Sequence, residues 1–295
     1  MKRILAAIVG LCLIATAATA FYQSRDSNYN QNIVSSGGGY TGPGDIVTFS
    51  GWWGLRAYSS ATRGTKAISL CDHLGANCAD VATSATTGVL NAPGTRGSDN
   101  CTSLTTCTVA TIYDKVSTND CTQATVANQA TLNMTGGPGG NTPALVFNGS
   151  SAQYSCVQSN QAQPVSLSTV AERTSAFTSF GTAVSYGGTN DLGFNSSANS
   201  AYIYAGAVGS ATATDSAWHA MQGLLSGASS ALYIDGTNTG SLSAGTTATG
   251  GGNTTIGKGV GGFLTGQASE FGTVASDASA NFSIINSNQH TFWGF

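Results

Sequence analysis

The chain has 295 residues, a formal net charge of −3 and charged side chains at only 8% of its positions. Its 11 Phe, 10 Tyr and 4 Trp residues can build an apolar core, which excludes the disordered class with its high charge and few aromatics. Because Lys and Arg are not in excess, we expect no nucleic-acid partner.

The N-terminus has the pattern of a secretory signal. A basic start precedes the apolar run Ile4–Ala18, and Ala18 and Ala20 are small residues at the spacing of a cleavage site. We therefore expect residues 1–20 to be a signal peptide and the mature chain to be secreted or held outside the cytoplasm. The apolar run is short for a bilayer span, so no stable membrane span is expected after cleavage. An uncleaved anchor is the alternative.

Residues 21–44 are polar and rich in Gly and Ser, which predicts a linker or tether. From residue 45 onwards, strand-like runs such as "DIVTFSGWWGL", "CTVATIYD" and "SAYIYAG" alternate with clusters of Gly, Asn, Ser and Asp. This pattern predicts one all-β domain over residues 45–295, built as a sandwich, jelly roll or barrel. The one helix candidate is "SANFSIINSNQHTFWG", where Phe282, Ile285 and Gln289 share a face.

Six cysteines follow the predicted signal, and an even number in an exported chain predicts disulfides. Several connectivities are possible for six cysteines. Short spacing favours the small loops Cys71–Cys78 and Cys101–Cys107, which leaves Cys121–Cys156 as the third pair.

The three histidines, His73, His219 and His290, are scattered along the chain. A metal cluster usually needs CxxC spacing and nearby histidines, so we expect neither a metal nor another cofactor. A Ser-His-Asp site also lacks support, because no GxSxG segment is present. We expect His219, which follows Trp218 in a strand-like run, to be a packed or hydrogen-bonded sheet residue.

Two aspartates follow strand-like runs directly and suit turns. Asp114 enters the polar segment "KVSTND", and Asp235 begins the hairpin sequence "DGTNTG". Such side chains accept hydrogen bonds from nearby backbone N–H groups. We therefore expect both to be structural, with a ligand role as the alternative for Asp235.

Carboxylates are the main candidates for chemistry, because a glycosidase normally needs two of them beside the scissile bond. Glu270 lies in the strand-like run "GQASEFGTVAS", where a carboxylate on a sheet face suits a sugar ligand or a catalyst. A solvent-facing strand position is the alternative. Asp191 and Asp215 are the other weak catalytic candidates.

Aromatic side chains could stack on the apolar faces of sugar rings. We select Trp53, Tyr186 and Tyr204 as candidate platforms, with Asp191 and Glu270 as candidate ligands for hydroxyl groups. Core packing is the alternative for each aromatic residue.

Two segments, "WGLRAYSSATRG" and "CTSLTTCTVATIYDKVSTNDCTQAT", resemble the catalytic domain of family 54 α-L-arabinofuranosidases. That family has a "TRALYSAYTG" opening, then a Cys pair that Cys101 and Cys107 resemble, then "ITIIYDQSGNGNHLTQA". The downstream "SALYIDGTNTGSL" and "IGKGVGGFLTGQASEFGTVA" also look like laminin-G-type concanavalin A-like domains. The resemblance implies a concanavalin A-like jelly-roll sandwich of two antiparallel sheets.

The resemblance also implies removal of arabinofuranose from polysaccharides, but the family's catalytic positions differ here. The segment that would carry the nucleophilic Glu reads "AGAVGSATATDSA", whose only acid is Asp215. The turn that would carry the acid/base Asp reads "GKGVGG", with Gly259 or Val260 near its place. The family's adjacent Cys pair falls on Thr182 and Ala183, and its arabinose-binding module has no counterpart.

Three functions follow from these patterns. The first is an exported β-sandwich that binds carbohydrate or another cell-surface ligand without turnover, since the catalytic carboxylates are replaced. The second is an active arabinofuranosidase with relocated acids. The third is a structural or adhesive surface protein, displayed through the Gly-rich residues 35–44.

Overall fold

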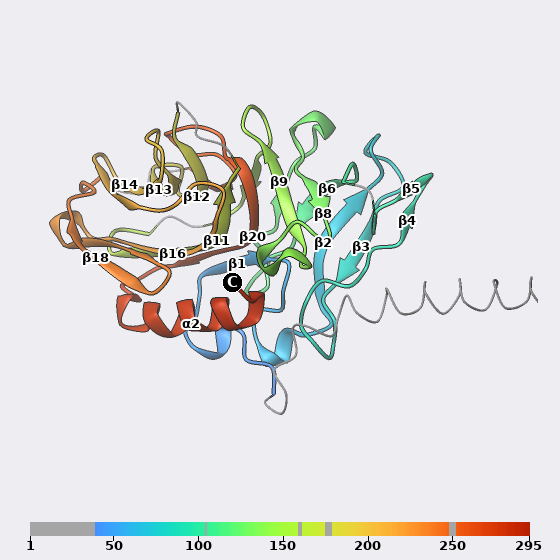
Figure 1. The fold of residues 1–295 in the computed structure, drawn as a ribbon, viewed down its shortest axis with the longest axis horizontal. Coiled ribbons are helices and arrows are strands. Elements are labelled where there is room, and N and C mark those ends of the chain that lie inside the picture. Colours follow the sequence, from blue (N-terminus) through green and yellow to red (C-terminus); the bar gives the residue numbers. More distant parts are fainter. Residues whose placement is uncertain (1–38, 104, 159–160, 175–178, 248–251) are drawn as a thin grey trace, which may run out of the picture. The chain divides into compact units, whose positions relative to one another are not determined.

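The computed structural model in Figure 1 describes residues 39–103, 105–158, 161–174, 179–247 and 252–295. The predicted signal peptide and most of the predicted linker lie outside the described residues. Gly39–Gly44, the described part of the predicted linker, belong to the same compact unit as the following residues. The reason is Tyr40, whose ring packs edge-on against Phe292 at a centroid distance of 5.7 Å and whose hydroxyl donates to the carbonyl of Ala57.

The described part is all-β, as the sequence predicts, with one α-helix near its end. The strands are β1 (Gly51–Gly54), β2 (Lys66–Cys71), β3 (Ala79–Ala82), β4 (Thr95–Arg96), β5 (Asp99–Asn100), β6 (Thr108–Ile112), β7 (Cys121–Thr122), β8 (Thr131–Asn133), β9 (Ala144–Asn148), β10 (Tyr154–Cys156), β11 (Val165–Arg173), β12 (Gly181–Tyr186), β13 (Asn190–Phe194), β14 (Ser200–Tyr204), β15 (Val208–Thr212), β16 (Trp218–Leu225), β17 (Ser230–Ile234), β18 (Thr237–Leu242), β19 (Thr254–Ile256) and β20 (Thr265–Val274). The helices are α2 (Phe282–Trp293) and the 3-10 turns η1 (Pro43–Asp45), η2 (Ser60–Thr62), η3 (Val126–Asn128), η4 (Pro138–Gly140), η5 (Gly227–Ser229) and η6 (Ser279–Asn281).

Of the described strands, 18 belong to one continuous antiparallel sheet, and β4 and β5 form a separate pair. Strand β20 pairs along one edge with β11, from which β16, β17 and β18 follow in order. Its other edge pairs with β1 and with β9. From β9 the ladder continues through β8, β6, β7, β10 and β19 to β12, β13, β14 and β15. Strands β2 and β3 join it at β6.

The β12–β15 strands lie against β11, β16 and β17, as Figure 1 shows. Gly223 in β16 marks the contact between these layers. A Cβ at that position would lie 2.7 Å from a methyl carbon of Ile203 in β14 and 3.5 Å from one of Leu192 in β13. Ile203 and Leu192 are fully buried. Glycine is therefore needed here, because a side chain would push the strands apart.

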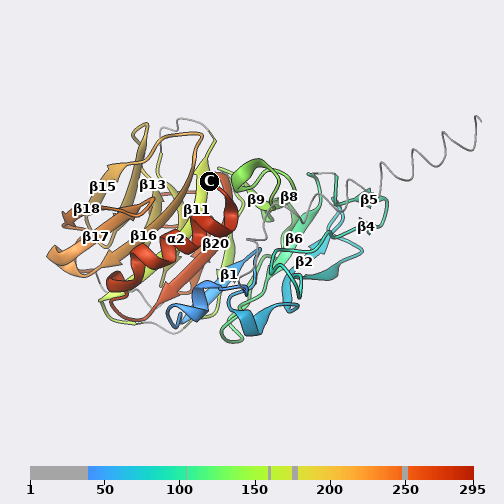
Figure 2. The same cartoon turned by 60° about the horizontal axis from the view of Figure 1, so that its bottom comes forward.

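Helix α2 covers the other face of β11, β16 and β20 (Figure 2). Phe282, Ile285 and Gln289 lie on its buried side, as the sequence predicts. Gly294 ends the helix at φ +75°, a left-handed conformation that glycine adopts readily, and its amide donates to the carbonyl of His290 at 2.8 Å. None of the helices in the described part has the length and apolar content that a bilayer crossing requires.

The three predicted disulfides are confirmed: Cys71–Cys78, Cys101–Cys107 and Cys121–Cys156. The third joins neighbouring strands, because Cys121 in β7 lies opposite Cys156 in β10. Within the described ranges, no group of three or more His, Cys, Asp and Glu side chains is arranged to hold a metal ion. The disulfides fit a chain that matures in an oxidising compartment.

Candidate functional site

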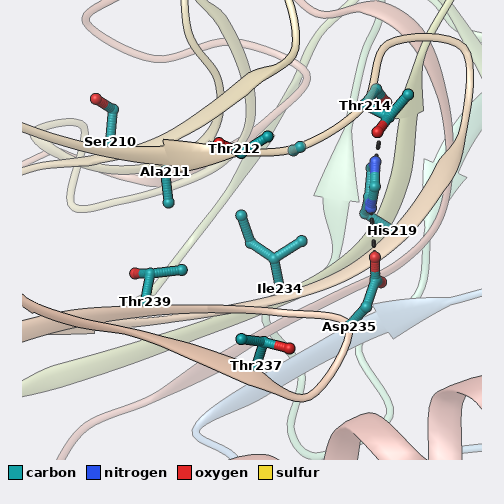
Figure 3. Close-up of a pocket in the computed structure, with 10 residues that line it drawn as sticks. Ser210, Ala211, Thr212, Thr214, His219, Ile234, Asp235, Thr237 and Thr239 are labelled. Carbon is teal, nitrogen blue, oxygen red and sulfur yellow. Dashed lines mark hydrogen bonds and ion pairs between the residues drawn. The ribbon is translucent and has the colours of Figure 1, made fainter.

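A pocket of about 560 Å³ lies between β15 and the β17–β18 hairpin (Figure 3). We call it the threonine pocket. Ala211 of β15 and Ile234 of β17 point into it from opposite sides. The residues in its lining that carry hydroxyl groups are Ser210, Thr212, Thr214, Thr237 and Thr239. The pocket therefore combines a small apolar surface with several hydroxyl groups. The hydroxyl of Thr239 already donates to the carbonyl of Leu232 at 2.7 Å, and Ser210 points to the side opposite to Ala211 (Figure 3).

His219 forms one end of the threonine pocket and bridges two of its walls (Figure 3). Its Nδ1 lies 2.6 Å from Oδ2 of Asp235, and its Nε2 lies 2.9 Å from the carbonyl oxygen of Thr214. Burial opposes the positive charge of the ring, but the hydrogen bonds to Asp235 and Thr214 outweigh it and raise the pKa of His219. The sequence prediction of a hydrogen-bonded sheet histidine is confirmed.

Asp235 connects this end of the pocket to helix α2. It adopts φ +50° in the tight β17–β18 turn. Its Oδ1 accepts a hydrogen bond from the amide of Ala220 at 3.0 Å and lies 3.3 Å from Nε2 of His290. Burial opposes its charge, but the hydrogen bond and the charge of His219 dominate and lower the pKa of Asp235. Asp235 thus has the structural role predicted for it. Its carboxylate, however, accepts from the amide of Ala220 on the neighbouring strand β16 instead of from its own turn.

Asp191 on β13 lies in a second, buried polar cluster. Its Oδ2 accepts from the hydroxyl of Tyr202 at 3.3 Å and from the amide of Gly261 at 3.4 Å, and Thr182 lies 3.4 Å away. Asp191 is fully buried, and this burial raises the pKa of its carboxyl. A Cβ at Gly259 would lie only 2.4 Å from Asp191 Oδ2, so a larger residue there would have to displace the carboxylate.

The structure therefore brings together two positions that are far apart in the sequence. The family resemblance assigns one of them to the adjacent Cys pair and the other to the acid/base residue. Thr182 lies beside Asp191, and the Gly259–Gly261 turn covers both. Tyr204, another predicted ligand residue, is half-buried and lies opposite Asp191 in the β13–β14 ladder. Asp191 and Tyr204 are the two predicted ligand residues that share a neighbourhood.

Glu270 lies elsewhere, under helix α2. Its carboxylate pairs with the guanidinium of Arg56, whose Nη2 lies 3.2 Å from Oε2, and it accepts from Gln289 at 3.0 Å and from the indole of Trp293. Arg56 and Glu270 are both completely buried. The position is thus neither the open sheet face nor the solvent-facing position considered from the sequence, because α2 covers this side of β20.

The remaining candidates are also held by other parts of the chain. Trp53 is buried and donates from its indole to the carbonyl of Asn119 at 2.9 Å, and Tyr186 is 1% exposed. Their predicted roles as open stacking platforms are not reproduced, because both rings pack in the core. Asp215 pairs with the guanidinium of Arg173, which is itself buried.

Asp114 has the predicted turn role. Its Oδ1 accepts from the amides of Trp52 and Val116, each at 3.0 Å, and its Oδ2 accepts from the hydroxyl of Ser117 at 2.5 Å. The carboxylate therefore fixes the turn after β6 and ties it to β1.

The sequence interpretation missed the pairing of His219 with Asp235. A signal for it was present in the hairpin sequence. Extending the antiparallel register Met221↔Ile234 by one step places Asp235 opposite Ala220, next to His219. The sequence alone did not show that β15 would complete a pocket around this pair.

No protein-family model matches the chain, and no curated protein matches its sequence. Among solved structures, an arabinofuranosidase complexed with arabinofuranosyl-α-1,2-xylobiose matches with a TM-score of 0.63 and 14% identity over 86% of this chain. A family 54 α-L-arabinofuranosidase soaked with a cyclic sulfate inhibitor matches with a TM-score of 0.62 and 14% identity, also over 86% of this chain. The chain covers only 65% and 66% of the lengths of those two proteins. At this identity the likeness establishes a shared β fold.

Proposed function

We propose that the chain is an exported, concanavalin-like jelly-roll sandwich that binds carbohydrate and does not hydrolyse it. The observation that carries this proposal is that each candidate carboxylate is held by its own partners. These are backbone amides for Asp114, Tyr202 and Gly261 for Asp191, Arg173 for Asp215, His219 for Asp235 and Arg56 for Glu270. Retaining hydrolysis instead needs two carboxyl groups about 5 Å apart across the sugar.

The threonine pocket is our proposed ligand site. Its volume of about 560 Å³ lies within the range of small-molecule sites. The hydroxyl groups suit a polyhydroxylated ligand, and Ala211 and Ile234 can contact its C–H groups. The fold shared with arabinofuranosidases favours a carbohydrate over other hydroxylated ligands.

Replacing Thr237 with Val should weaken sugar binding about two- to twelvefold, since a lost hydrogen bond costs about 0.5–1.5 kcal/mol. The substitution removes the hydroxyl and keeps the side-chain shape. A glycan array rich in arabinose-containing oligosaccharides would find the ligand, and calorimetry would measure its affinity. Thr118→Val, at an exposed position outside the pocket, is the matched control and should bind like the wild type. The proposal fails if the folded chain binds no sugar on the array.

A relocated glycosidase is a second candidate, favoured by one observation. The carboxyl of Asp191 has a raised pKa, as a general acid requires, and it lies under the turn where the resemblance places the family's acid/base residue. Opening of the Gly259–Gly261 turn would have to expose it. This candidate still needs a second carboxylate, since Asp191 has none among its hydrogen-bond partners within the described residues.

If this second candidate holds, the chain should hydrolyse an aryl α-L-arabinofuranoside, and Asp191→Asn should slow that reaction by about 100-fold or more. Asp277→Asn, at an exposed turn, is the control and should keep the wild-type rate. Release of the aryl alcohol, followed by absorbance, measures both. Absence of hydrolysis by the wild type on a panel of aryl glycosides would rule this candidate out.

A further inference from the structure

We propose that protonated His219 is the positioning residue of the threonine pocket, so that ligand binding there weakens as the ring loses its proton. The ligand part of this inference rests on the proposed function, whereas the chemistry of the ring does not. His219 joins Asp235, at the end of the β17–β18 hairpin, to Thr214, which follows β15 (Figure 3). We call this three-residue arrangement the histidine clasp.

The geometry of the clasp requires two ring protons. At 2.6 Å, Nδ1 faces a carboxylate oxygen of Asp235, and at 2.9 Å, Nε2 faces the carbonyl oxygen of Thr214. The carbonyl can only accept a hydrogen bond, and so can the ionised carboxylate. A neutral imidazole carries a single N–H, so one contact would then set two lone pairs against each other. Both contacts form together only in the imidazolium state.

Charges from the surrounding elements favour that state. Asp235 comes from the β17–β18 turn, and Asp215, in the connection between β15 and β16, adds a second negative charge. Nε2 of His290 on α2 lies 3.3 Å from Oδ1, the other carboxylate oxygen of Asp235, so His290 competes with His219 for the negative charge. On β11, Arg173 neutralises Asp215 in part, and Glu172 is tied to Gln267 of β20.

The direction of the pH effect follows from these contacts. Because His219 has a raised pKa, the clasp is complete at acidic pH and is lost as pH rises through that pKa. The ionised state of Asp235, whose pKa is lowered, is kept throughout this interval. When the ring loses one proton, one of its nitrogens presents a lone pair to the lone pair of the facing oxygen, so that contact becomes repulsive.

The Thr214 contact is the one that reaches the pocket wall. Asn199 accepts from the amide of Ala213 at 3.0 Å and its side chain accepts from the amide of Asp215 at 2.9 Å. These bonds hold the residues on either side of Thr214, so we expect the change near β15 to centre on Thr214. Thr214 and His219 both line the threonine pocket, and a displaced Thr214 alters the surface that meets the ligand.

A titration of the ligand-free protein followed by NMR tests the clasp directly. We expect the His219 ring nitrogens to show the imidazolium state at low pH, with a pKa above about 6.5, the ordinary histidine value. The carbonyl carbon of Thr214 should change its shift with the same midpoint, because its hydrogen bond breaks. A ring that titrates below about 6.5, or a Thr214 carbonyl that does not follow it, would overturn the proposal.

Calorimetry with arabinofuranosyl-α-1,2-xylobiose between about pH 5 and pH 9 tests the consequence for binding. The Kd should rise up to about tenfold per pH unit above the pKa of His219, because binding takes up one proton there. His219→Gln removes the titrating group and should make the Kd independent of pH. His73→Gln, which changes a half-exposed histidine paired with Asp99, is the control and should keep the slope.

The NMR titration and the calorimetry distinguish failure of the proposed function from failure of the histidine clasp. If the oligosaccharide does not bind at any pH, the proposed function fails for this ligand, and the NMR titration still decides on the clasp. If binding occurs and His219→Gln keeps the wild-type pH slope, the positioning role is refuted. Should His219→Gln fail to fold, the wild-type NMR midpoint compared with the wild-type binding midpoint gives the same decision.

Discussion

Replacing Arg56 with Met should lower the free energy of unfolding by about 3–5 kcal/mol, which is the usual cost of leaving one charge of a buried pair alone. Arg56 is completely buried beside Glu270. Its guanidinium also lies 4.6 Å from the centre of the Phe292 ring, so its removal ends a cation–π contact as well. Urea unfolding followed by tryptophan fluorescence, with the disulfides intact, measures the change.

A surface ion pair provides the matched control. Lys66 pairs with Asp80 on β2 and β3, but its side chain is 65% exposed. Lys66→Met should therefore cost about 1 kcal/mol or less. The double variant Arg56→Met/Glu270→Gln should recover part of the loss, because no buried charge is then left without its partner. Equal stability of the Arg56 and Lys66 variants would contradict the burial argument.

Removing the Cys121–Cys156 disulfide should have an effect of similar size. The bond spans 35 residues, and in the chain-entropy account a loop of that length stabilises the fold by about 4 kcal/mol. Alanine is the suitable replacement at both positions, because both cysteines are completely buried and serine would bury a hydroxyl group. Thermal unfolding of the double variant measures the loss.

The Cys101–Cys107 pair is the control for this prediction, since it is equally buried but spans only 6 residues. Its removal should cost about 2 kcal/mol. At about 2–4 °C per kcal/mol, the Tm of the Cys121/Cys156 variant should lie about 4–8 °C below that of the Cys101/Cys107 variant. Equal Tm values would show that loop length does not determine the contribution of these bonds.

Local patterns in the sequence were sufficient for the elements of the fold. Alternating β-branched and aromatic runs predicted the all-β class, and the spacing of Phe282, Ile285 and Gln289 predicted the buried face of α2. The short loops between cysteines predicted the pairing. Each of these signals lies within a few residues of the chain, where backbone preference and side-chain periodicity dominate.

Burial of the candidate site residues could not be predicted in the same way. Glu270 is covered because Arg56, 214 residues away, pairs with it and α2 lies over both. The sequence around Trp53 and Tyr186 would look the same if these rings lined a groove. Their burial in the core depends on the placement of strands that are distant in the sequence. The pairing of His219 with Asp235 is a shorter-range case that a hairpin register could have revealed.

The pairing of β1 with β20 also determines when β1 can join the sheet. Strand β1 forms its ladder with a strand near the end of the domain, in the register Gly51↔Thr273 to Gly54↔Glu270. A nascent chain on the ribosome therefore exposes β1 without its partner until β20 has been synthesised and released. Contacts of such large sequence separation form slowly. Strand β1 therefore has to wait for the end of the domain, whereas the local pairing of β2 with β3 and β6 needs only residues 66–112.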